Sequence, residues 1–259
     1  MRIAIIGNGA IARHVQDWLA GKPHELAAIL MRPGRSADAG AVPTVHSVTE
    51  LPAPLDLVVD CAGHAALAQH GPAILASGTD LLTVSLGALA DAALHNRLRE
   101  AAERGGARLH LASGAIGALD CLQAARAGGL TEVTYRGRKP PAGWAGSPAE
   151  DVLDLAALTE GSAIHFDGTA RAAALAYPKN ANVAAAVALA GLGFDATRAV
   201  LIADSGITGN IHEIEATGAF GQFSFRIEGR PLPGNPRSSA LAAMSVTARL
   251  EQLSSPVVL

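Results

Sequence analysis

A glycine-rich segment near the start of the chain has the residue types and the spacing of a phosphate-binding turn. Residues 7–12 read Gly-Asn-Gly-Ala-Ile-Ala and match the pattern G-x-G-x-x-G/A. Gly7 would allow a tight turn, Gly9 would let the backbone approach a pyrophosphate, and the small Ala12 would let a helix pack closely on a strand. Free N–H groups where that helix begins, around Ala10 and Ile11, favour anionic phosphates. These five residues predict a dinucleotide site, against the alternative of a glycine-rich packing turn in a chain with 28 glycines.

The segment that follows the second apolar run bears on which dinucleotide would bind. In NAD-binding chains an acidic side chain normally takes the ribose hydroxyls at this point. Leu30–Arg35 contains no carboxylate, whereas Arg32 and Arg35 could pair with a 2′-phosphate. The alternative is that both arginines are exposed loop residues. We therefore expect NAD or NADP as the cofactor, with Arg32 among the residues that bind it.

The elements that would position these residues alternate along the first half of the chain. Short apolar runs, which we expect to be strands, alternate with helical patterns. Apolar strands joined by helices predict a doubly wound, mostly parallel sheet, an α/β fold of the Rossmann type. The expected strands are Arg2–Ile6, Leu26–Met31, Thr44–Val48, Leu55–Cys61, Leu81–Leu86 and Leu109–Ala112, and the expected helices are Ile11–Leu19, Ala65–Ala76 and Ala92–Glu103.

The pattern changes after about Ser113 and predicts a second, α+β domain with a mixed sheet. A helix over Ala118–Ala127 and an alternating strand over Glu132–Arg138 come first, followed by a loop rich in Pro and Gly. Three later runs predict antiparallel strands, Ala199–Ala203, Ile211–Thr217 and Gln222–Glu228, the last two joined by a turn at residues 218–221. Asn235-Pro236 would begin a helix that continues to about Leu253. We expect domains over 1–111 and 112–235, with 236–259 as a helix that packs back on the first domain.

Several longer strings in this second half carry a resemblance to a known family. The chain resembles the L-aspartate dehydrogenase family over essentially its whole length. The resemblance implies NAD(P)-dependent oxidation of L-aspartate to iminoaspartate, which hydrolyses to oxaloacetate and ammonia or enters NAD synthesis, with reductive amination as the reverse reaction. It also implies a homodimer. The strings that carry it are Ala112–Asp120, Tyr135–Pro140, Tyr177–Ala184, Asn210–Glu213 and Gly218–Gly221.

The resemblance also implies roles for individual residues. His212 matches the active-site histidine of the family, and Ala115 and Asn182 match positions that contact the nicotinamide cofactor. An imidazole exchanges protons near neutral pH, and His212 lies beside the polar Asn210 and Glu213, so we expect it to act as the base.

Other polar residues are candidates for binding the substrate, each with an ordinary structural alternative. Lys179 could hold a carboxylate or be a solvated cap, and Asn210 stands next to the catalytic string. Ser238 and Ser239 follow Asn235-Pro236 at the expected helix start, where they could receive an anionic group or simply cap the helix. Arg138 and Lys139 are further candidates of this kind. His64, in the loop after a strong core strand, could border the cofactor or have only a helix-start or packing role.

Composition excludes several classes of protein. The 259 residues are 49% hydrophobic and 17% charged, which excludes disorder. The net charge is −3 without a basic block, so nucleic acid is not an expected partner. The longest apolar stretches, such as Val183–Leu192, are too short to cross a bilayer, and no signal peptide fits before Gly7, so a cytoplasmic location is expected. Cys61 and Cys121 have no metal-ligand spacing, and we expect no metal.

Two alternatives to the dehydrogenase remain open. One is an NAD(P)H-dependent imine reductase that resembles dihydrodipicolinate reductase, which would need a basic cluster in the second domain. The other is a nucleotide-sensing protein without turnover, which would bind the dinucleotide but act on no amino acid.

Overall fold

Six strands of the first half form a parallel sheet in the order β3-β2-β1-β4-β5-β6. The computed structural model describes residues 1–37, 40–178, 180 and 182–257. Each strand is short and apolar, as expected for a parallel sheet that is covered on both faces. The strands are β1 (Arg2–Ile6), β2 (Glu25–Leu30), β3 (Thr44–Val45), β4 (Leu57–Asp60), β5 (Asp80–Thr83) and β6 (Leu109–Leu111).

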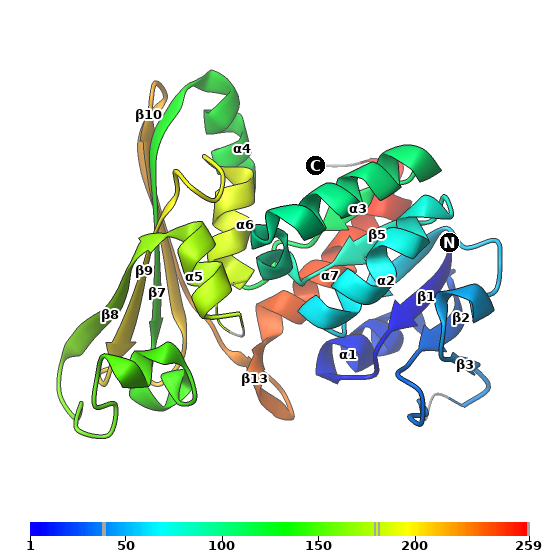
Figure 1. The fold of residues 1–259 in the computed structure, drawn as a ribbon, viewed down its shortest axis with the longest axis horizontal. Coiled ribbons are helices and arrows are strands. Elements are labelled where there is room, and N and C mark those ends of the chain that lie inside the picture. Colours follow the sequence, from blue (N-terminus) through cyan, green and yellow to red (C-terminus); the bar gives the residue numbers. More distant parts are fainter. Residues whose placement is uncertain (38–39, 179, 181, 258–259) are drawn as a thin grey trace. The chain divides into compact units, whose positions relative to one another are not determined.

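Helices cover both faces of this sheet because neighbouring strand residues point to opposite sides. Ile3 and Ile5 pack in one core with Val15 of α1 (Ala10–Leu19) and with Val246 and Leu250 of α7 (Ala240–Ser254). On the other face, α2 (His64–Ala76) and α3 (Ala92–Gly105) lie side by side (Figure 1). The predicted α/β fold with a Rossmann-type sheet is confirmed, and the last helix of the chain completes the core of this sheet.

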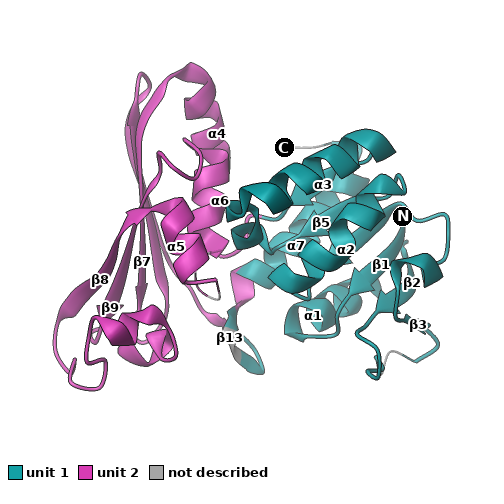
Figure 2. Ribbon diagram, in the orientation of Figure 1, with its two compact units in different colours: residues 1–112, 232–238, 242–259 teal, residues 113–231, 239–241 magenta. Residues whose placement is uncertain are grey.

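The chain divides into two compact units (Figure 2). Unit 1 contains Met1–Ala112, Leu232–Ser238 and Ala242–Leu259, and unit 2 contains Ser113–Pro231 and Ser239–Leu241. The chain therefore leaves unit 1 after β6, returns to it near Leu232 and contributes α7 to it. Among the described residues, no helix combines the length and the apolar character needed to cross a membrane.

Unit 2 is built on a five-stranded mixed sheet in the order β11-β10-β7-β9-β8. The strand β7 lies at its centre, antiparallel to β10 and parallel to β9. The hairpin expected at residues 218–221 is confirmed, because Gly218 pairs with Gly221. The elements are α4 (Leu119–Gly128), β7 (Leu130–Lys139), β8 (Ser162–Thr169), α5 (Ala170–Ala176), α6 (Asn182–Ala190), β9 (Arg198–Asp204), β10 (Ile211–Gly218) and β11 (Gly221–Glu228).

The two faces of this second sheet differ in chemistry. One face, which we call the inner face, carries apolar residues such as Val133, Ile214 and Ala216, and the helices α4, α5 and α6 pack on the sheet (Figure 1). The opposite, outer face carries ion pairs between strands, among them Arg136 with Glu215 at 2.6 Å. A polar side chain on the inner face is therefore an exception that requires a physical explanation.

Four expectations about elements were wrong or incomplete. The fifth strand ends at Thr83, not Leu86, because the hydroxyls of Thr83 and Ser85 donate to Asp60 and turn the chain into a 3-10 helix over Leu86–Ala90. The strand over Ala199–Ala203 was expected to be antiparallel, but it runs parallel to β7 and antiparallel only to β8. The elements β8 and α5 were not predicted, and α6 was noted only as an apolar stretch.

The fourth wrong expectation concerns the start of the last helix. Asn235-Pro236 does not begin it: residues Asn235–Ser239 form the strand β13, which pairs with β12 (Pro231–Leu232). Gly234, with a φ of +77°, lies between these two strands, and the helix α7 begins at Ala240. The short β12–β13 pairing satisfies backbone groups that a helix start at residue 235 would have had to satisfy otherwise.

Candidate functional site

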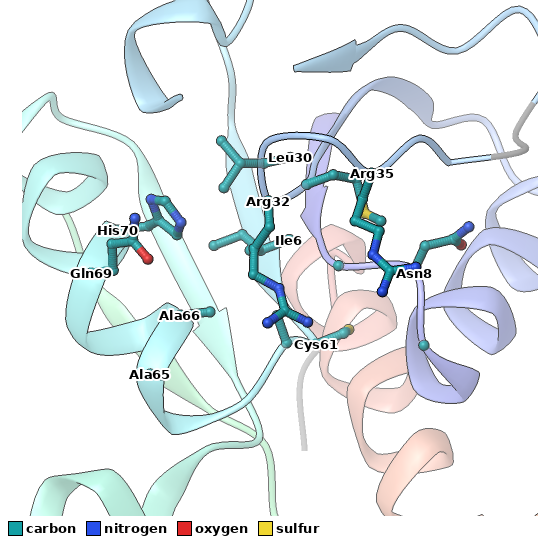
Figure 3. A pocket seen from close by; sticks show the side chains of 14 residues that line it. Ile6, Asn8, Leu30, Arg32, Arg35, Cys61, Ala65, Ala66, Gln69 and His70 are labelled. Atoms are coloured by element: carbon teal, nitrogen blue, oxygen red, sulfur yellow. The ribbon is translucent and has the colours of Figure 1, made fainter. Parts of the chain in front are cut away.

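A cavity of about 470 Å³ lies in unit 1 at the carboxyl ends of β1, β2 and β4 (Figure 3). Ile6 and Leu30 are the last residues of β1 and β2, and Cys61 directly follows β4. In open α/β sheets, ligands bind beyond the carboxyl ends of the strands. The position of the cavity thus agrees with that of a dinucleotide site.

The two glycines of the phosphate-binding motif have distinct roles in this cavity. Gly7 has a φ of +91°, and a Cβ there would lie 3.0 Å from the Cβ of Ala62, so a larger residue would be strained and crowded. Gly9 directly precedes α1, and a Cβ there would meet no atom within 4 Å. Gly9 therefore leaves open space at the start of the helix, where a phosphate could approach the backbone N–H groups.

Two arginines make one wall of this cavity positively charged. Arg32 and Arg35 line it, the residues that line it include no carboxylate, and neither arginine forms an ion pair with a described residue. Gln69 and His70 of α2 lie on another wall (Figure 3). Burial lowers the pKa of His70, which favours the neutral form of its imidazole. Sequence reasoning missed Gln69 and His70, because only the fold brings α2 to the motif.

Of the five motif residues, Gly7 and Gly9 line the cavity, as does Arg32. Ala10 and Ile11 form the first turn of α1 instead. Ala12 is fully buried in the core beside Ile3, which is the close packing of helix on strand that its small side chain allows. The residues present fit a dinucleotide, with the backbone near Gly9 facing phosphates and the arginines facing further anionic oxygens.

His212 lies on the inner face of the sheet in unit 2, only 4% exposed. It occupies β10 directly opposite Gly137 of β7. Its Nδ1 lies 2.9 Å from the phenolic oxygen of Tyr135, and the two rings are nearly parallel. Burial, together with the positive charge of Lys139, lowers the pKa of His212 to about 4. The imidazole is therefore neutral at physiological pH and able to accept a proton.

Gly137 is what lets Tyr135 reach this histidine. Tyr135 and Gly137 are two residues apart on β7 and point to the same face. A Cβ at position 137 would lie 2.5 Å from the phenolic oxygen, far inside van der Waals contact. The tyrosine side chain therefore extends along the strand across the glycine, and burial raises its pKa so that it stays protonated.

Lys139, two residues beyond Gly137, is the last residue of β7 and lies on the same face. Its Nζ donates a hydrogen bond of 2.5 Å to the side-chain oxygen of Asn180 and lies 5.0 Å from the ring centroid of Trp144. Burial lowers its pKa to about 8, and its charge acts on His212. The inner face thus holds a neutral base and a partly buried ammonium group. Alternation in residues 135–139 was the signal in the sequence that could have grouped these residues.

Glu213, which the sequence places next to His212, does not share its face. Glu213 points to the outer face, where it accepts from Arg138 at 3.2 Å and from Arg226 at 2.7 Å. Neighbouring residues of a strand alternate between its two faces, so Glu213 does not contribute to the surroundings of the histidine. Arg138 is also on the outer face and pairs with Asp204 as well. Asn210 precedes β10, and its carbonyl accepts from Gly229 at 2.8 Å.

The other predicted site residues lie on separate elements. Asn182 is the first residue of α6, and Ala115 lies in the segment between β6 and α4. Ser238 and Ser239 lie on β13, not in the first turn of a helix; Ser238 accepts from Asn235, and the buried hydroxyl of Ser239 has no partner among the described residues. Lys179 lies outside the described residues. Their roles stay predictions. The described residues contain no group of three or more His, Cys, Asp or Glu that could hold a metal.

Comparison with known proteins places both units in described families. Residues 120–253 match the family described as "Aspartate dehydrogenase, C-terminal", and residues 7–112 match "Homoserine dehydrogenase, NAD binding domain". An L-aspartate dehydrogenase of Ruegeria pomeroyi is 61% identical over 97% of this chain and 92% of that protein. One of Cupriavidus necator is 46% identical over 96% of both chains.

A solved structure agrees with these sequence matches. Aspartate dehydrogenase from Thermotoga maritima is 26% identical, with a TM-score of 0.79 over 100% of this chain and 99% of that one. A hyperthermophilic archaeal homoserine dehydrogenase in complex with NADPH has a TM-score of 0.60 at 13% identity, a likeness of fold alone.

Proposed function

Since this chain belongs to the L-aspartate dehydrogenase family, we propose that it oxidises L-aspartate to iminoaspartate with a nicotinamide dinucleotide as hydride acceptor. One observation carries the proposal beyond the family: a buried, neutral His212 held by Tyr135 on the mostly apolar inner face. Unit 1 would bind the cofactor and unit 2 the amino acid.

His212 would act as the base. If its Nδ1–H donates to the oxygen of Tyr135, the lone pair of Nε2 is available to take a proton from the substrate ammonium group. The cofactor, when bound, supplies C4 of the nicotinamide as the acceptor for the hydride that leaves Cα of aspartate. A C=N bond then forms at Cα. A low pKa keeps His212 unprotonated before the substrate arrives, and the negative charge of the substrate would raise that pKa enough for proton transfer.

A panel of substrates tests this function. Absorbance at 340 nm is followed with L-aspartate, L-glutamate and L-alanine, each with NAD and with NADP. We expect L-aspartate to be oxidised far faster than the other two. Equal or greater rates with L-glutamate or L-alanine contradict the assignment, and tight NADPH binding without turnover of any amino acid would favour the nucleotide-sensing alternative.

The cofactor choice is the finer part of the proposal. We expect NADP to be accepted, because Arg32 and Arg35 line the cavity and the residues that line it include no carboxylate to repel a 2′-phosphate. Replacing both arginines with Ala should weaken NADP more than NAD by roughly 1–3 kcal/mol in a binding titration. Arg13→Ala, an exposed cation of α1, is the control and should change neither affinity. Equal weakening of both cofactors would show that the arginines do not read that phosphate.

The homodimer and the delivery of iminoaspartate to NAD synthesis stay predictions that rest on the family resemblance. The cytoplasmic location stays a prediction from the sequence alone.

A further inference from the structure

Lys139 is a cation on the inner face of the sheet, which is mostly apolar and also carries His212 and Tyr135. Its Nζ has an amide oxygen of Asn180 at 2.5 Å and the ring of Trp144 at 5.0 Å. The amide oxygen accepts a hydrogen bond and the indole ring attracts the cation, but neither group carries a negative charge that would neutralise it. The ammonium is therefore oriented, and no anionic side chain of the described residues pairs with it.

The other cations of β7 show what a structural charge looks like in this sheet. Arg136 pairs with Glu215 at 2.6 Å, and Arg138 pairs with both Glu213 and Asp204. The ion pairs that the described residues form do not include Lys139. Neighbouring residues of one strand thus divide into paired cations on the outer face and an unpaired one on the inner face.

A buried charge without a counterion destabilises a fold. The stability of the sheet would be greater with an apolar side chain at position 139, so its cation is explained by a ligand that supplies the missing negative charge. Lys139 also lies two residues beyond Gly137, the residue that pairs with His212, so the ammonium and the imidazole are diagonal neighbours on one face. An anion at Lys139 would lie next to the proposed base.

We propose that Lys139, oriented by Asn180 and Trp144, is a carboxylate-binding subsite of this protein that receives one of the two carboxylates of the amino-acid substrate. This inference rests on the proposed function, because that function supplies the dicarboxylate. The ammonium then has two effects: it binds the substrate, and its charge adds to the burial that lowers the pKa of His212, an addition that a bound carboxylate would offset.

Lys139→Met tests the subsite, with Arg136→Met as the matched control that removes a cation from the outer face of the same strand. Succinate, a dicarboxylate without the amino group, is the binding probe, titrated by calorimetry in the presence of NADP. We expect Lys139→Met to weaken succinate binding and to raise KM for L-aspartate by at least about tenfold, the size of a lost charge-assisted hydrogen bond. The Kd for NADPH should change less than twofold, and the control should leave succinate binding and KM unchanged.

Thermal unfolding without ligand separates this role from a structural one. If Lys139 serves the ligand, Lys139→Met should keep or raise the Tm, because it removes an uncompensated buried charge. Lys139→Gln, which keeps an N–H donor for Asn180 but no charge, should lose succinate binding as well and guards against a misfolded methionine variant. L-asparagine keeps only the α-carboxylate of aspartate, and β-alanine keeps only the β-carboxylate. Both are tested as inhibitors of L-aspartate oxidation, and the one whose inhibition is weaker in Lys139→Met than in the wild type identifies the carboxylate that Lys139 binds.

Three results would overturn the subsite: wild-type protein that does not bind succinate, unchanged succinate binding in both Lys139 variants, or a lowered Tm with succinate binding intact. Failure of the proposed function gives a different pattern. In that case the wild-type protein does not oxidise L-aspartate, whereas the loss of succinate binding in the Lys139 variants still supports the subsite.

Discussion

His212 is one of nine histidines, and its surroundings distinguish it from the others. Its imidazole is buried on an apolar face, it is neutral because burial and Lys139 lower its pKa to about 4, and Tyr135 holds its Nδ1. His165 has similar surroundings: it is buried, its Nδ1 lies 3.2 Å from the oxygen of Tyr177, and burial lowers its pKa to about 4. Substituting each of these two histidines in turn therefore distinguishes a catalytic role from the effect of burial alone.

Substitution of His212 should affect turnover much more than cofactor affinity. General acid–base catalysis typically contributes about 10²–10⁴-fold in rate. His212→Ala should lose at least ~10²-fold in kcat/KM while the Kd for NADPH stays nearly unchanged. His212→Asn keeps a polar amide but exchanges no proton near neutral pH, so it should be nearly as poor as Ala.

His165→Asn is the matched control for burial, and it should lower stability while turnover persists. Circular dichroism and melting curves must first show each variant folded. Near-normal kcat/KM in folded His212→Ala would remove this residue from the mechanism, and rescue by Asn would reduce its role to hydrogen bonding.

A single strand, β7, positions most of the site in unit 2. Period-two alternation sends Tyr135, Gly137 and Lys139 to the inner face and Arg136 and Arg138 to the outer face. The spacing between the tyrosine and the lysine is occupied by a residue without a side chain, which leaves room for the phenol to reach β10. A substitution at Gly137 should therefore displace Tyr135 and, through it, alter the position of the His212 ring.

Gly137→Ala and Tyr135→Phe test this dependence. Loss of the phenolic oxygen frees the His212 ring, so Tyr135→Phe should lower kcat by roughly tenfold, about 1.4 kcal/mol, with little change in KM. Gly137→Ala should lower kcat similarly and also lower the Tm, because the new Cβ meets the phenolic oxygen at 2.5 Å.

The double variant shows whether the two effects are coupled. Phe has no oxygen to meet the new Cβ, so Gly137→Ala should be less destabilising in the Tyr135→Phe background, as measured by urea unfolding in a double-mutant cycle. Strict additivity would mean that the glycine does not act through the tyrosine.

At the scale of the whole molecule, both units depend on residues that are distant in sequence. Unit 1 takes Val246 and Leu250 of the last helix into the core of the first strand. Unit 2 encloses two neutral histidines, His165 and His212, whose protonation the folded state opposes. The pH dependence of folding follows from these two groups.

Stability should fall as the solution is acidified below pH 6.5. The unfolded chain binds protons at His165 and His212 near pH 6.5, whereas the folded chain does so only near pH 4, so the stabilisation is complete above pH 6.5 and is lost as pH falls toward 4. Each histidine should contribute about 2 kcal/mol to the loss between pH 7 and pH 5.

Urea unfolding of the wild type and of His165→Asn at both pH values measures this contribution. The variant should be less stable at pH 7 but should lose less stability on acidification, since one of the two groups is gone. The same loss in both proteins would mean that His165 is not held neutral by the fold.

Part of the fold could be predicted from short segments of the sequence alone. The turn at Gly7 and Gly9, the strands and helices around it, and the hairpin between β10 and β11 follow from backbone freedom and periodicity, which depend on a few consecutive residues. The resemblance in longer strings identified His212 as the base to be tested. These signals suffice because each is complete within a short segment.

The tertiary structure decided what depends on pairing between distant segments. Only the register of β7 with β10 brings Tyr135 to His212, which is 77 residues away, and turns Glu213 to the opposite face. The parallel alignment of β9 and the strand at Asn235 likewise depend on their partners. Burial is also a tertiary property: it lowers the pKa values of His212 and Lys139, because the helices and strands that exclude water come from across the chain.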